Sequence, residues 1–145
     1  MAVLTAQEKK IDTEAESIAT NLSRQLASAG TGDLANGFAA NFAINLLAST
    51  FGIPCDEIPE FGARYWRAQR GVSWRPELQR DGKQAINELI AYFEPIVAKR
   101  QNNPSDDMVS AMAQLEQPAN AKDIVVTLLE ADHETLHGAL ANLWY

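Results

Sequence analysis

The sequence predicts an all-α fold, and three observations support this prediction. Apolar residues recur at spacings of three, four and seven over most of the 145 residues, as they do on one face of a helix. No segment of convincing length alternates apolar and polar residues as a strand would. Glycine and proline fall between the helical segments, where they end helices. We therefore expect a single multi-helix domain over residues 1–145.

Two helices are expected in the first third of the chain. The first carries an apolar face that includes Ile11 and Leu22, and Gly30-Thr31-Gly32 ends it. The second begins after Asp33, a favourable N-cap residue, and continues to Phe51. Its apolar residues surround much of the helix axis, which is typical of a buried helix.

Two further helices are expected in the middle of the chain. A short one begins at Asp56 or Glu57 and closes near Gly71. A long one begins around Pro76-Glu77, because proline is favoured in the first turn of a helix. Pro95 lies within this helix and predicts a kink.

The last third begins with a polar loop over residues 101–105. Ser105 or Asp106 is then expected to cap a short helix, and a second loop follows over residues 117–120. From Lys122 to Leu143 the sequence predicts one continuous helix, which would be about 30 Å long at about 1.5 Å per residue.

Composition and charge exclude several classes of partner. The formal net charge of -7 repels phosphate groups, so neither nucleic acid nor an anionic membrane is expected. No apolar run approaches the length that spans a bilayer, and the start of the sequence lacks the pattern of a signal peptide. We expect a cytoplasmic protein, in which the single cysteine, Cys55, forms no disulfide within the chain. Trp66, Trp74 and Trp144 are expected to be core or helix-packing residues rather than platforms on which a ligand stacks.

Three segments occur in an order that is typical of one family. The first contains Gly32-Asp33-Leu34 and ends at Phe51-Gly52-Ile53-Pro54. The second contains Asp106-Asp107 and Val109-Ser110-Ala111. The third is Leu128-Leu129-Glu130-Ala131-Asp132-His133-Glu134-Thr135. These segments resemble the G-D-L to L-G-V-P, P-G-D-D-L-L-S-A and L-L-x-A-G-H-E-T-T stretches of bacterial cytochromes P-450.

The resemblance implies the central helices of the cytochrome P-450 fold, up to the oxygen-binding helix. It implies haem only for that family as a whole, because the family's cysteine loop would follow this helix and the sequence ends at Tyr145 before any such loop. Cys55 lies before the helix, and we expect it to be a small packing residue. No haem is therefore expected in the isolated chain.

The resemblance also assigns conditional roles to residues on the last helix. Glu134 and Thr135 match the acid and alcohol that organise water and deliver protons on the distal side of the haem. Ala131 and Asp132 match positions that face the haem. Asp132 stands where the family has glycine, which puts the usual local opening of that helix in doubt.

The same helix also contains the pattern H-E-x-x-H, formed by His133, Glu134 and His137. Histidines four residues apart share a helix face and can bind Zn²⁺, while the glutamate polarises a water molecule. No histidine, cysteine or acid follows in residues 138–145 to provide a third ligand. An alternative interpretation is that both histidines lie on the helix surface or are hydrogen-bonded residues of the core.

These observations leave three hypotheses for the function. The first is a small-molecule-binding or protein-interaction module without monooxygenase activity of its own. In this case, apolar faces left uncovered would favour a homo-oligomer, another protein partner or a small apolar ligand. The second is a fragment of a haem-dependent monooxygenase that is active only in the full-length enzyme. The third is a zinc-dependent hydrolase that uses the H-E-x-x-H pattern.

Overall fold

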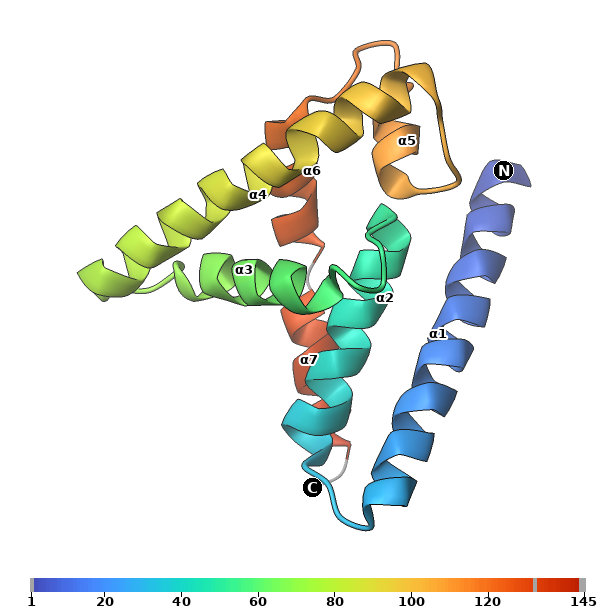
Figure 1. Ribbon diagram of the computed structural model, residues 1–145, viewed down its shortest axis with the longest axis vertical. Coiled ribbons are helices and arrows are strands. Elements are labelled where there is room, and N and C mark those ends of the chain that lie inside the picture. Colours follow the sequence, from blue (N-terminus) through green and yellow to red (C-terminus); the bar gives the residue numbers. More distant parts are fainter. Residues whose placement is uncertain (1, 132, 144–145) are drawn as a thin grey trace. The chain divides into compact units, whose positions relative to one another are not determined.

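Helices form every regular element of the computed structural model, which describes residues 2–131 and 133–143. This result confirms the predicted all-α class. In chain order the elements are α1 (Ala2–Ala29), the π-helix η1 (Leu34–Ala40), α2 (Asn41–Phe51), α3 (Ile58–Arg70), α4 (Pro76–Asn102), α5 (Met108–Ala113), α6 (Ala121–Glu130) and α7 (His133–Asn142) (Figure 1). None of the described helices is long and apolar enough to cross a membrane.

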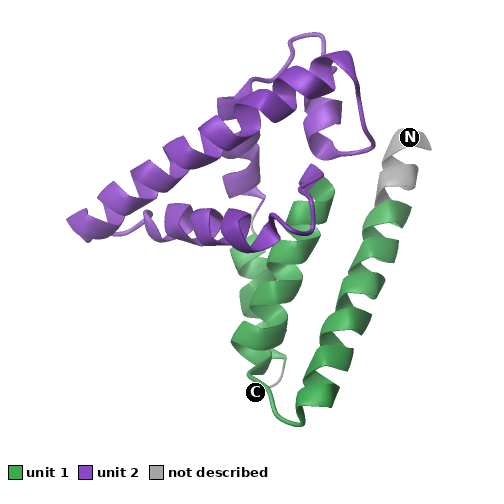
Figure 2. Cartoon of the chain, viewed as in Figure 1, with its two compact units in different colours: residues 1–50, 132–145 green, residues 51–131 purple. Residues whose placement is uncertain are grey.

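The chain divides into two compact units, which Figure 2 shows in different colours. The first consists of residues 1–50 and 132–145, and the second of residues 51–131. Because the chain leaves the first unit and returns to it, the second unit is one continuous segment. The organisation as a single domain stays a prediction.

In the first unit, Gly30 follows the last residue of α1, and its φ of 73° lies in the left-handed region that favours glycine. Asp33 caps the next helix as predicted, and its Oδ1 accepts hydrogen bonds from the backbone N–H groups of Ala35 and Asn36, both at 3.0 Å. The helix from Asp33 to Phe51 is not uniform, however, because η1 precedes α2. Apolar spacing indicates a helix but does not distinguish a π-helical turn from an α-helical one.

The core of the second unit forms where α3, α4 and α6 pack together. Phe61 from α3 and Phe93 from α4 are fully buried and meet edge to face, with ring centroids 6.4 Å apart. Ile124 and Leu128 bring the apolar face of α6 into the same core. The α4 helix continues through Pro95 as a single element to Asn102. The predicted kink at this proline stays a prediction.

The N-cap of α5 is Asp107, so the prediction of Ser105 or Asp106 was wrong by one or two residues. Asp107 is favoured because one oxygen of its carboxylate accepts the backbone N–H of Ser110 at 2.7 Å. Its other oxygen accepts from Arg100 Nε at 2.8 Å.

The predicted continuous helix from Lys122 to Leu143 was also wrong. The structure ends α6 at Glu130 and begins α7 at His133, which belongs to the other unit. At Ala131 the backbone has φ −68° and ψ 4°, which departs from the α-helical ψ of about −42°. No glycine or proline marks this change in the sequence, so the apolar spacing gave no sign of it.

Candidate functional site

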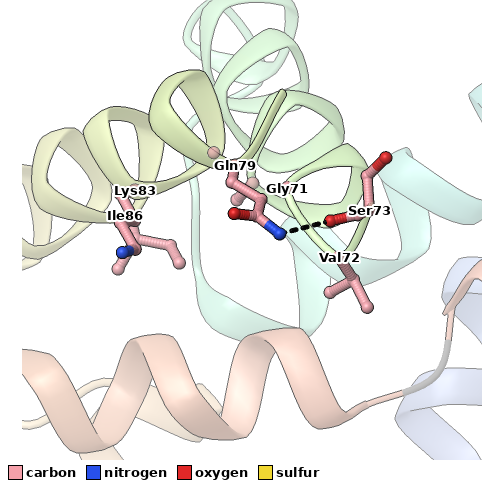
Figure 3. A pocket seen from close by; sticks show the side chains of 8 residues that line it. Gly71, Val72, Ser73, Gln79, Lys83 and Ile86 are labelled. Atoms are coloured by element: carbon pink, nitrogen blue, oxygen red, sulfur yellow. Dashed lines mark hydrogen bonds between the residues drawn. The ribbon is translucent and has the colours of Figure 1, made fainter. Parts of the chain in front are cut away.

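A cavity of about 550 Å³ lies where α3 ends and α4 begins (Figure 3). Most of its lining is apolar, and it involves both helices and the loop of residues 71–75 between them. The lining residues are Ala68, Gly71, Val72, Ser73, Gln79, Gly82, Lys83 and Ile86. A concave, mainly apolar surface with a few polar groups is the usual form of a small-molecule site.

Two glycines that line this cavity, Gly71 at the end of α3 and Gly82 on α4, lie in close contact. A Cβ atom placed on Gly82 would lie 2.4 Å from Gly71 Cα and 3.1 Å from Gly71 N. A Cβ atom on Gly71 would lie 2.8 Å from Gly82 Cα. The distances of 2.4 Å and 2.8 Å between carbon atoms are far below van der Waals contact, so the observed contact requires glycine at both positions.

A hydrogen bond fixes the loop at the edge of the cavity. Gln79 Nε2 on α4 donates to the carbonyl oxygen of Ser73 at 2.7 Å, drawn as a dashed line in Figure 3. In the same view Val72 lies on one side of the Gln79 side chain, and Lys83 and Ile86 lie on the other. The hydrogen bond therefore holds the loop in place beside an apolar surface that carries one cationic side chain.

The same loop exposes two large apolar side chains. Val72 is 88% exposed and Trp74 is 85% exposed. The guanidinium carbon of Arg75 lies 5.5 Å from the centroid of the Trp74 ring, within the range of a cation–π contact. The expectation that Trp74 is a core or helix-packing residue was therefore wrong, because this side chain lies in the short loop between α3 and α4 and is largely exposed. Trp144 lies outside the described residues.

Ion pairs hold the two helices together beside the cavity. Arg67 on α3 donates from Nη2 to Asp81 Oδ1 and from Nη1 to Glu88 Oε2, both on α4, and each of these distances is 2.7 Å. These hydrogen bonds from Arg67 hold the pKa of the Asp81 and Glu88 carboxyl groups below their ordinary values. Gln69 Nε2 also donates to the carbonyl oxygen of Leu129 at 3.2 Å, which joins α3 to α6.

A second cavity, of about 450 Å³, lies near the other end of α4. Its lining includes Gly52, Pro54, Ile96 and the pair formed by Tyr92 and Glu57. The phenol of Tyr92 donates to Glu57 Oε2 at 2.6 Å. Burial, followed by the hydrogen bond to the Glu57 carboxylate, raises the pKa of Tyr92.

None of the described residues to which the sequence assigned conditional roles lines either of these two cavities. Glu134 and Thr135 are exposed in the first turn of α7, and His133 and His137 are half-buried on the same helix. Ala131 is the exposed C-cap residue of α6. Asp132 lies outside the described residues. The roles assigned to these positions stay predictions.

A metal or haem site finds no support in the described residues. Within them, no three His, Cys, Asp or Glu side chains are placed to hold one metal ion. Cys55 is exposed, so the expectation that it packs as a small apolar residue was wrong. It follows Pro54 in a turn before α3, where no neighbouring segment covers it. An exposed turn does not provide the enclosed pocket that a haem thiolate requires, so these residues do not fit that group.

Comparisons with known proteins agree with the order of the helices. The chain is 26% identical over 120 residues to a cytochrome P-450 of Bacillus subtilis, covering 78% of this chain and 29% of that protein. It is 26% identical over 141 residues to cytochrome P-450(BM-1) of Priestia megaterium, covering 88% of this chain and 33% of that protein. No protein-family model matches the chain.

Solved structures show the same fold. The mixed-function cytochrome P-450 MycG, in complex with mycinamicin IV, superimposes with a TM-score of 0.78 at 23% identity, over 97% of this chain and 37% of MycG. PksS, a cytochrome P-450 of the bacillaene polyketide synthase of Bacillus subtilis, gives a TM-score of 0.70 at 18% identity, over 91% of this chain and 35% of that one.

The fold is therefore that of a helical part of a haem-thiolate monooxygenase. The chain matches bacterial cytochromes P-450 as a fragment and spans about a third of their length. The resemblance identified from the sequence is thereby confirmed. The cavity between α3 and α4 was not predicted. The only sign of it in the sequence is a pair of glycines, Gly71 and Gly82, on either side of the loop.

Proposed function

We propose that this chain binds apolar small molecules in the cavity between α3 and α4. The observation that supports the proposal most strongly is the cavity itself, whose lining is mainly apolar and includes the closely packed Gly71 and Gly82. A ligand with an apolar body would displace water from Val72 and Ile86, and each buried CH₂ group contributes about 0.8 kcal/mol. The function is thus binding, with no chemical step assigned to the isolated chain.

Fluorescence titration with N-phenyl-1-naphthylamine, a neutral apolar dye, tests this proposal. Val72→Asp places a carboxylate at the cavity edge, and it should not affect folding because Val72 is 88% exposed. We expect about tenfold weaker binding, since losing the contact of one valine side chain costs about 1.5 kcal/mol. Val126→Asp is the matched control, because Val126 is an exposed valine on α6 outside the cavity lining. Equal effects of the two variants would contradict the proposal.

A second proposal is that the chain provides the distal helical part of a haem-dependent monooxygenase that is active only with the rest of the fold. The matches to cytochromes P-450 over about a third of their length support it. The test is a chimera in which this chain replaces the matching span of the Bacillus subtilis relative. We expect the chimera to bind haem and give the thiolate-type carbon monoxide spectrum. A folded chimera without haem would contradict this second proposal.

Self-association is a further proposal, supported by the apolar side chains at the surface. Ile11, Leu34, Val72, Trp74, Leu115, Val126 and Leu143 are each more than a third exposed. Sedimentation velocity over a range of concentrations tests it. A rise of the sedimentation coefficient with concentration is expected, whereas a constant monomer value would contradict it.

A further inference from the structure

The charges of the chain are distributed unevenly along the sequence. Its formal net charge is -7, yet six of its 12 lysines and arginines lie within residues 64–83. Only two carboxylates, Glu77 and Asp81, lie in the same segment. This segment includes the end of α3, the loop and the start of α4, which together surround the cavity. The cavity therefore lies in a cationic region of an otherwise acidic chain.

Internal ion pairs neutralise only part of this positive charge. Arg64 pairs with Glu60 at 2.5 Å, and Arg67 pairs with Asp81 at 2.7 Å. Lys83 is different, because it is exposed and lines the cavity, and no carboxylate of the described residues lies within 4.0 Å of its ammonium group. Glu77 does not line the cavity. The free cationic group nearest to a bound ligand is thus Lys83.

We infer that the ligands of this cavity are apolar anions, with a carboxylate or sulfonate group beside Lys83 and an apolar body against Val72 and Ile86. This inference rests on the proposed binding function and specifies its ligand class. An uncharged ligand gains only from the apolar lining, while an anion also gains from Lys83 and from the surrounding arginines. The cavity therefore selects ligands by charge as well as by apolar area.

Two dyes with the same aromatic body test the inference. N-phenyl-1-naphthylamine is neutral, and 8-anilino-1-naphthalenesulfonate adds one sulfonate. The wild-type chain should bind the anionic dye about five- to tenfold more tightly at low ionic strength, and 0.5 M salt should remove most of this difference. Lys83→Gln should weaken binding of the anionic dye about three- to fivefold more than that of the neutral dye. Lys83→Arg should retain the binding of the anionic dye.

Lys122→Gln is the matched control, since Lys122 is an exposed lysine on α6 that does not line the cavity. It removes the same net charge and should change neither affinity. Equal binding of the two dyes, or equal effects of the two glutamine variants, would overturn the inference while leaving the proposed binding function intact. Failure of the wild-type chain to bind either dye would overturn both.

Discussion

The close approach of α3 and α4 can be tested with a single methyl group. In Gly82→Ala the new Cβ would lie 2.4 Å from Gly71 Cα, and backbone atoms cannot turn aside as a side chain can. Overpacking of this kind costs about 1–3 kcal/mol. Alanine also gains about 1 kcal/mol over glycine within a helix. We therefore expect a net loss of up to about 2 kcal/mol, because two backbones must separate to admit the methyl group.

The same substitution at Gly138 provides the control. Gly138 lies within α7, and a Cβ there meets nothing within 4 Å. Gly138→Ala should therefore stabilise the chain by about 0.5–1 kcal/mol. Thermal unfolding followed by circular dichroism should separate the two variants by several degrees, at about 2–4 °C per kcal/mol. A Gly82→Ala variant as stable as Gly138→Ala would refute the argument from close helix contact.

Three further predictions concern charged and titratable groups. Asp107→Ala removes the cap of α5 and the carboxylate that pairs with the largely buried Arg100. Urea unfolding should therefore show a free energy of unfolding that is lower by about 3 kcal/mol. An unchanged urea midpoint would contradict this prediction. Arg67 keeps the pKa of Asp81 below its ordinary value of 3.8. As the pH falls below 3.8 and Asp81 becomes protonated, the wild type should therefore lose stability more steeply than Arg67→Gln. Identical pH profiles of thermal unfolding for the two proteins would contradict this prediction. Burial and a nearby carboxylate raise the pKa of Tyr92 above 10.0. The stability that this phenol contributes should therefore be lost as the pH rises above 10. An ultraviolet titration of Tyr92→Phe should lack one tyrosine that ionises late in the wild type.

The sequence predicted those features that depend on local chemistry. Apolar spacing located the helices, and Asp33 marked a helix start because a short carboxylate side chain reaches the free N–H groups of the first turn. The end of α2 was equally clear, because Gly52 adopts a φ of 71° that other residues rarely take. Motif order was also sufficient to identify the family.

Features that depend on distant contacts were not predictable from the sequence. Gly71 and Gly82, which line the cavity, come into contact from the two ends of the segment that joins α3 to α4. Nothing in the sequence indicates that these two glycines contact each other. Composition likewise did not show that Trp74 and Cys55 are exposed, since an apolar residue is buried only where another element covers it. The change of backbone at Ala131 occurs without any helix-breaking residue.

The most direct test of the binding site is an NMR titration of the ¹⁵N-labelled chain with N-phenyl-1-naphthylamine. The backbone amides of Gly71, Val72, Ser73 and Gly82 should shift, because they surround the cavity and the glycine signals fall in a well-resolved region. Shifts concentrated at these residues, and absent from α1, are the predicted result. Shifts confined to α1 or to α7, with the signals of Gly71, Val72, Ser73 and Gly82 unchanged, would contradict a binding site between α3 and α4.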